Sequence, residues 1–168
     1  MQHPQGVRIE LNAPGTTLEM FPQGIMPLDF IINAEHRIVV CHGTGVFNLS
    51  NTRQFRARMM ADRHFSPEMS QVIDFRDISE IKATAKDVQQ LAEDTVFSKE
   101  SRRAFVVASQ LQFGLSRMFG TLREVAGEKQ FRVFRDMDEA IGFVGVDPGV
   151  VLEALAALRR KHLPKKVA

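Results

Sequence analysis

The 168-residue sequence contains no tryptophan and no tyrosine, so phenylalanine supplies all 13 of its aromatic side chains. It has one cysteine, Cys41, which excludes a disulfide within the chain. No apolar run approaches the roughly 18–20 residues of a membrane-spanning helix, so we predict no integral membrane segment. The N-terminus lacks the basic and apolar stretches of a secretory signal. These absences favour a cytoplasmic protein.

Motifs of known catalytic and metal sites are also missing. The sequence has no HExxH, CxxC or G-x-S-x-G motif and no spaced set of histidines and aspartates that would bind a metal. Cys41 and His42 are neighbours in a strand-like run, so we expect them to point to opposite faces, with Cys41 as a small core residue. We therefore predict a non-enzymatic protein with no catalytic residues, cofactor or metal. An unspecified hydrolase is the alternative.

Charge is distributed unevenly along the chain. The net charge is +2, but residues 159–168 hold five of the 22 basic side chains and no acid. The remainder carries 17 basic against 20 acidic side chains, a net charge of about −3. A mildly acidic body does not offer the basic surface that nucleic acids require, so we predict no nucleic-acid partner. The basic tail is expected to complement a helix C-terminus, with contact to phosphates or anionic lipid as the alternative.

Apolar periodicity divides most of the chain into alternating strands and helices. The predicted strands are Asp29–Asn33, Arg37–Cys41, Gln71–Phe75, Ala104–Ala108 and Gln130–Phe134. The predicted helices run from Asn48 or Ser50 to about Asp62, from Thr84 to near Ser98, from Ser109 to Ala126, from Asp136 through Phe143, and from Pro148 to before Pro164. This order predicts an α/β fold with a mainly parallel five-stranded sheet. Its first strand is antiparallel, because only a short hairpin turn separates it from the second.

The helix after Ser109 is the most strongly patterned element. Its predicted apolar stripe consists of Leu111, Leu115, Met118, Phe119, Leu122, Val125 and Ala126. Phe113 and Arg117 lie on the opposite face, with Gly120 and Glu124. An aromatic side chain beside an arginine suits a ligand or partner surface, so Phe113 and Arg117 are candidate binding residues. A scattered exposed aromatic residue is the alternative.

Two aspartates follow the third predicted strand. Asp74 and Asp77 fall at the carboxyl end of a parallel strand, where open α/β sheets place their ligands. They are therefore candidate binding residues as well. Capping of turns and pairing with Arg76 are the alternatives that the sequence leaves open.

The two ends of the chain differ from its middle. Residues 1–25 are rich in proline and glycine and are expected to form a partly disordered extension, with Met26 as an alternative start. Residues 26–146 form the predicted domain, and residues 147–168 add a helix and the basic tail. Helices stacked on one side of a sequentially wound sheet would leave part of the other side bare. The helix Pro148–Arg160 is expected to cover it, with a homodimer contact as the alternative.

The run from about Pro27 to Val146 resembles the SpoIIAA-like proteins, relatives of the STAS (sulfate transporter and anti-sigma factor antagonist) domains. The pieces that carry the resemblance are IVV followed by GTG, then VIDFRDI, RRAFVVAS, FGLSRMF and FRVFRDMDEAIGFV. The resemblance implies a β–α superhelix with sequential strands, similar in outline to the CRAL-TRIO lipid-binding domains. In the anti-sigma factor antagonists a phosphorylated serine opens the helix after the third strand, in an Asp-Ser-Ser-Gly setting.

The matching stretch here is Lys82-Ala83-Thr84-Ala85, which makes Thr84 the candidate phosphoacceptor. A phosphate at a helix N-terminus is electrostatically favourable. The other three residues of the motif differ, and an ordinary N-cap explains Thr84 equally well.

Two functions follow from the patterns and the resemblance. The first is a STAS-like regulatory or protein-interaction module with a protein partner. The alternative is a binding protein for a small apolar or lipid-like anion, because a Met- and Phe-rich interior near Arg117 suits such a ligand. A plain hydrophobic core is the other interpretation of that composition.

Overall fold

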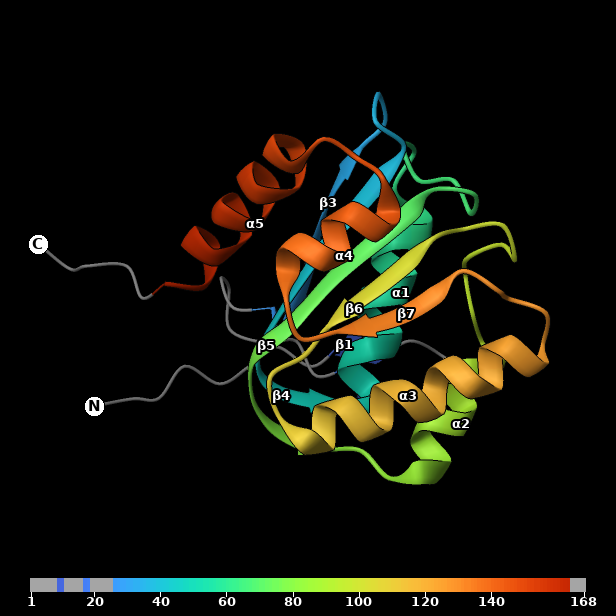
Figure 1. Ribbon diagram of the computed structural model, residues 1–168. Coiled ribbons are helices and arrows are strands. Elements are labelled where there is room, and N and C mark those ends of the chain that lie inside the picture. Colours follow the sequence, from blue (N-terminus) through green and yellow to red (C-terminus); the bar gives the residue numbers. More distant parts are fainter. Residues whose placement is uncertain (1–8, 11–16, 19–25, 164–168) are drawn as a thin grey trace, which may run out of the picture.

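The computed structural model describes residues 26–163 and two isolated short strands, β1 (Ile9–Glu10) and β2 (Thr17–Leu18), which pair antiparallel (Figure 1). Apart from β1 and β2, the predicted N-terminal extension of residues 1–25 lies outside these described parts, as do residues 164–168 of the basic tail. No helix among the described residues is both long and apolar enough to cross a membrane.

The main sheet has five strands in the order β3-β4-β5-β6-β7. Their bounds are Leu28–Asn33, Ile38–Asn48, Ser70–Lys82, Arg103–Val106 and Phe131–Phe134. β3 pairs antiparallel with β4, and the other neighbours pair in parallel. The prediction of a mainly parallel five-stranded sheet with an antiparallel first strand is therefore confirmed.

Five helices cover the sheet in two layers (Figure 1). They are α1 (Leu49–Ala61), α2 (Ala85–Glu93), α3 (Gln110–Val125), α4 (Met137–Val144) and α5 (Pro148–His162). The first three pack on one face of the sheet and share one core, while α4 and α5 pack on the opposite face and share a second core. Val151, Leu155 and Leu158 of α5 are buried in that second core, so α5 covers the second face as predicted.

The capping signals of the sequence place most helix ends. Asn48 caps α1, Thr84 caps α2 and Ser109 caps α3, each side chain accepting a backbone N–H of the first turn. Gly145 ends α4 in the left-handed conformation, with φ 70°. α2 ends at Glu93, earlier than predicted, and Phe97 beyond it turns into the core.

β4 and β5 are longer than predicted, since both continue past the polar and glycine residues that suggest loops. β4 includes the HGTG run, where the register against β5 shifts between His42 and Thr44 and again between Gly45 and Val46. Gly45 has φ +71°, a conformation that a side chain disfavours. His42 therefore lies inside a strand, and its side chain is buried between the sheet and α5.

The buried face of α3 differs from the predicted apolar stripe. Leu111 is 57% exposed and Val125 is 84% exposed. The residues that are buried are Gln112, Ser116, Phe119, Gly120 and Arg123. The middle of the predicted stripe is correct, because Leu115, Met118, Phe119 and Leu122 pack on the first core. Its ends are wrong, and Gln112 and Arg123 are buried because they have hydrogen-bond partners inside the protein. Gly120 lies against Phe131, whose ring carbons would be 2.5 Å from an added Cβ atom, so it does not belong to an exposed face.

Candidate functional site

A cavity lies between the sheet and helices α1, α2 and α3. The volume open to the centres of water-sized molecules is about 90 Å³. One water needs roughly 10–15 Å³ by this measure, so the space is several waters large. Most of its walls are apolar, and the lining side chains include Phe47, Phe55, Phe75, Leu91, Phe105 and Phe119. Such walls give water few hydrogen-bond partners and are typical of a site for a mainly apolar ligand.

A few polar side chains interrupt the apolar lining. They are Thr52, Arg56, Gln71, Arg103, Gln112 and Ser116. The Gln112 amide is satisfied by the protein, because it accepts from the N–H of Ala108 at 2.8 Å and donates to the carbonyl of Ile78 at 3.3 Å. The Ser116 hydroxyl makes no hydrogen bond to any of the described residues and is therefore available to a molecule in the cavity.

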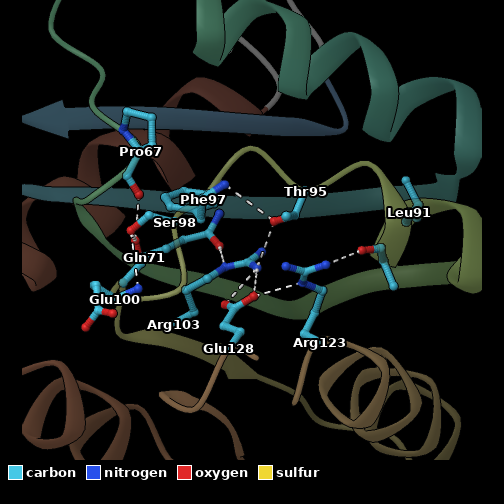
Figure 2. A network of polar contacts seen from close by, with 12 residues as sticks. Pro67, Gln71, Leu91, Thr95, Phe97, Ser98, Glu100, Arg103, Arg123 and Glu128 are labelled. Carbon is cyan, nitrogen blue, oxygen red and sulfur yellow. Dashed lines mark hydrogen bonds and ion pairs between the residues drawn. The ribbon is translucent and has the colours of Figure 1, made fainter. Parts of the chain in front are cut away.

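A network of buried charges stands at the β6 side of the cavity (Figure 2). Arg103 of β6 donates from Nη1 to Glu128 Oε1 at 3.1 Å and from Nε to Gln71 Oε1 at 3.0 Å. Arg123 of α3 donates from Nε to Glu128 Oε2 at 2.9 Å and from Nη1 to the carbonyl of Ala92 at 2.7 Å. The two arginines thus share one carboxylate, and they approach it from different elements.

The charges of this network do not cancel. Arg103, Arg123 and Glu128 are 3%, 7% and 1% exposed, so two buried cations face one buried anion. Burial lowers the pKa of Arg103, and Glu128 opposes that shift. The Nη2 atom of Arg103 has no hydrogen-bond partner within the described part of the chain. A positive excess and a free donor therefore lie at the wall of the cavity.

Four phenylalanine rings surround the Arg103 guanidinium. Its Cζ atom lies 4.7–5.8 Å from the ring centroids of Phe97, Phe105, Phe119 and Phe131. Each such contact contributes roughly 0.5–2 kcal/mol, which compensates only part of the cost of burying a cation. The rings also fix the guanidinium in place, so a ligand meets a preorganised donor.

A second arginine lines the cavity from the helical side. Arg56 of α1 donates from Nη1 to the carbonyls of Leu91 and Asp94, at 2.8 and 3.0 Å. Burial, assisted by the charge of Arg103, lowers the pKa of Arg56 to about 10. It satisfies carbonyls at the end of α2 and adds to the positive potential in the cavity.

The two predicted binding residues of α3 differ in their exposure to solvent. Phe113 is half-buried, and the Arg135 guanidinium stacks 4.8 Å from its ring centroid. Arg117 is exposed and does not line the cavity. The expectation that Arg117 serves the apolar interior was therefore wrong, because the arginines that line the cavity are Arg56 and Arg103.

Asp74 and Asp77 lie in the middle of β5, on the far face of the sheet from the cavity. Asp74 is fully buried and accepts two hydrogen bonds of 2.9 Å from Arg76, which is the alternative that the sequence left open. It also accepts from Arg159 of α5 at 2.8 Å. Asp77 accepts from His42 at 2.7 Å and lies 3.4 Å from Arg159. The prediction that the strand ends at these aspartates was wrong, because β5 continues to Lys82. Both carboxylates face α5.

Thr84 is exposed at the N-terminus of α2 and forms a complete capping box. Its hydroxyl accepts from the N–H of Asp87 at 3.2 Å, and the Asp87 carboxylate accepts from the N–H of Thr84 at 2.8 Å. The predicted N-cap role is confirmed. Phosphorylation of Thr84 stays a prediction, and the Asp87 carboxylate beside the hydroxyl opposes it by charge repulsion.

Cys41 occupies the core position that the sequence predicted. It is fully buried among the apolar side chains of the first core, and burial raises the pKa of its thiol to about 12. His42 points to the other face of the sheet, toward α5. The two side chains therefore do not act together.

No protein-family model matches the sequence, and no curated protein matches it. Among solved structures, the chain is similar to an uncharacterised protein of the DUF3478 family from Shewanella loihica PV-4, described as having a SpoIIAA-like fold. The match covers 74% of this chain and 99% of the other, with 15% identity and a TM-score of 0.47.

Nothing in the sequence marks the residues at the cavity wall. Arg103 begins a strand and Glu128 follows a helix, positions at which charged residues are common. The two residues are 25 positions apart, so no local sequence pattern indicates that they pair. One signal was available on α3, where Gln112, Ser116 and Arg123 share a helical face with Phe119. Polar residues that interrupt an apolar helix face suggest a buried polar network.

Proposed function

We propose that the protein binds a small amphipathic anion, with a hydrocarbon body in the cavity and an acid group at Arg103. The observation that carries this proposal is the excess of buried positive charge at the wall of an apolar cavity. A bound carboxylate would pair with the free Nη2 donor and supply the second negative charge of the network. Charge-assisted bonds of this kind are the strong ones in proteins.

The size and lining of the cavity support the apolar part of the ligand. The walls around this space of about 90 Å³ are mostly apolar, as in sites that bind a mainly apolar ligand. Filling it with hydrocarbon restores the dispersion contacts that the lining side chains lack. The Ser116 hydroxyl offers one further hydrogen bond to a polar atom of the ligand.

A matched pair of probes tests both parts of the proposal. Octanoate and 1-octanol have the same chain length and differ in the charge of the head group. We expect octanoate to bind with an enthalpy change measurable by titration calorimetry and 1-octanol to bind about 10- to 100-fold more weakly, since a hydrogen bond to a charged group contributes roughly 1.5–3 kcal/mol. Equal affinities would remove the anion from the proposal, and binding of neither probe would remove the cavity site.

Two arginine variants locate the acid group. Arg103→Met removes the proposed donor but leaves Arg123 and Glu128 as a balanced pair. It should lower octanoate affinity at least tenfold and leave 1-octanol affinity nearly unchanged. Arg117→Met is the matched control on the exposed side of α3 and should bind octanoate like the wild type. The opposite ranking would place the ligand at the surface.

The regulatory protein-interaction module predicted from the sequence is the second candidate function. The exposed N-terminus of α2 supports it, because Thr84 is accessible to a kinase or a partner. Thr84→Glu should change the set of proteins that co-purify with the chain while its melting temperature stays within a few degrees. Thr84→Ser keeps the cap and is the control, and identical sets from all three proteins would contradict this candidate.

A further inference from the structure

Two histidines meet on the face of the sheet opposite the cavity. His42 of β4 is 2% exposed, and His162 is the last residue of α5. Their Nδ1 atoms are 2.8 Å apart. His42 Nε2 lies 2.7 Å from Asp77 Oδ2, and His162 Nε2 lies 2.8 Å from the carbonyl oxygen of Met26. All four ring nitrogens therefore have a close polar neighbour.

The identity of these neighbours determines how many protons the two rings hold. The Met26 carbonyl can only accept, so His162 Nε2 carries a proton. The Asp77 carboxylate is an acceptor when ionised, so His42 Nε2 carries a proton as well. A contact of 2.8 Å between the two Nδ1 atoms then requires one proton between them. The pair holds three protons in all, which is a single positive charge.

We propose that this histidine pair is a pH-dependent latch between the end of α5 and the sheet, which adds to the ion pairs of Arg159 and Lys161 there and is favourable only while the pair holds one positive charge. The proposal goes beyond anion binding, because the latch lies on the other face of the sheet. It assigns α5 two arrangements of its last turn, one joined to β4 and one released.

Both directions of titration break the latch. In acid, a second positive charge places an N–H against an N–H at the Nδ1 contact. In alkali, loss of the shared proton leaves two lone pairs facing each other at the same distance. The contact is therefore favourable in a window of pH and unfavourable on either side. An ordinary ion pair between a histidine and a carboxylate differs, because it is not weakened by acid until the carboxylate itself is protonated.

The surroundings set the limits of that window. Burial and the charge of His42 lower the pKa of His162, so His162 resists the second proton. The hydrogen bond from His42 lowers the pKa of Asp77, so this carboxylate stays ionised. Arg159 of α5 also faces Asp77, at 3.4 Å. The remaining charged groups of the cluster are Asp74 and Arg76 of β5, Asp29 of β3 and Lys161 of α5.

Release of the last turn has a structural consequence. Leu158, one turn before His162, is fully buried in the core between α5 and the sheet. The Met26 carbonyl would lose its donor when His162 leaves. Opening the latch therefore loosens the α5 end of the second core and the start of β3 together.

Ring-nitrogen NMR of the full chain tests the proton count directly. Long-range proton–nitrogen spectra distinguish protonated from bare ring nitrogens. At the pH of greatest α5 stability we expect His162 to carry its proton at Nε2, His42 to be protonated at Nε2, and one shared proton on the Nδ1 pair. Two neutral rings, or a pair with two positive charges, would overturn the proposal.

Hydrogen exchange tests the mechanical part. The protection of peptides from 148–163, corrected for the intrinsic effect of pH, should pass through a maximum and fall about tenfold on each side. Peptides from α4 serve as the internal reference. His162→Asn should abolish the maximum, while His64→Asn, at an exposed histidine beside Asp62, should keep it. Protection of α5 in the wild type that changes in only one direction with pH would also overturn the proposal.

Discussion

Replacing Glu128 by glutamine is the sharpest test of the buried charge network. The substitution keeps the shape of the side chain and removes the one anion that Arg103 and Arg123 share. All three side chains are less than 10% exposed, so solvent cannot compensate the two arginines. Removing one partner of a buried ion pair costs about 3–5 kcal/mol. For a chain of this size that lowers the melting temperature by about 6–20 °C.

The comparison with Arg103→Met makes this prediction specific. That variant leaves Arg123 and Glu128 as a neutral pair and removes the cost of burying the Arg103 guanidinium. This gain offsets part of the lost contacts of Arg103 with Glu128, Gln71 and the phenylalanine rings, so we expect a smaller loss of stability than for Glu128→Gln. Chemical denaturation of the wild type and both variants measures the three free energies of unfolding. A Glu128→Gln variant less than 1 kcal/mol below the wild type, or an Arg103→Met variant below Glu128→Gln, would refute the account of unbalanced charge.

The effect of octanoate on the melting temperature of Glu128→Gln gives a second test of the charge network. Because Glu128→Gln leaves two uncompensated cations near the cavity, octanoate should raise its melting temperature more than that of the wild type. Octanol is the control, and it should stabilise both proteins to a similar small extent. Equal stabilisation of the two proteins by octanoate would separate the network from the ligand site.

The remaining predictions concern four positions that do not line the cavity. Gly120→Ala should destabilise the fold by about 1–3 kcal/mol, because the new Cβ atom meets the ring of Phe131. Gly114→Ala, on the same helix with open space around it, should instead stabilise by up to about 1 kcal/mol, and thermal melts distinguish the two signs. Ser109→Ala should cost about 1 kcal/mol through loss of the cap. Cys41 should stay unreactive toward a thiol reagent until the protein unfolds, and rapid labelling of the native protein would contradict its burial.

Local signals in the sequence were sufficient for much of the fold. Ser109, Thr84 and Asp147-Pro148 mark helix starts because capping chemistry acts within one turn. The alternation of strands with helices gives a parallel sheet because each helix returns the chain to the end of the sheet where the previous strand began. Val151 and Leu155 belong to one apolar stripe of α5. A sheet face without other cover must be buried by such a stripe, so their burial against the sheet could be predicted.

The remaining features depend on contacts between distant parts of the chain. β4 continues through HGTG because β5 supplies pairing partners on both sides of the irregular register, which no local pattern reveals. The buried face of α3 includes the charged side chain of Arg123, because it donates to Glu128 and to the carbonyl of Ala92. His42 and His162 meet across 120 positions, so their pairing depends on where α5 lies on the sheet. At positions that depend on such distant contacts, the sequence pattern does not predict the structure.

The ionisation state of a bound acid tests the central claim most directly. Octanoate labelled with ¹³C at the carboxyl carbon reports its own protonation by NMR while it is bound. If Arg103 holds the head group, the bound carboxylate should stay ionised from pH 8 down to pH 5, because a nearby cation lowers its pKa. A bound carboxyl that takes up a proton within that range would lie in an apolar site without a cation, and would contradict the account.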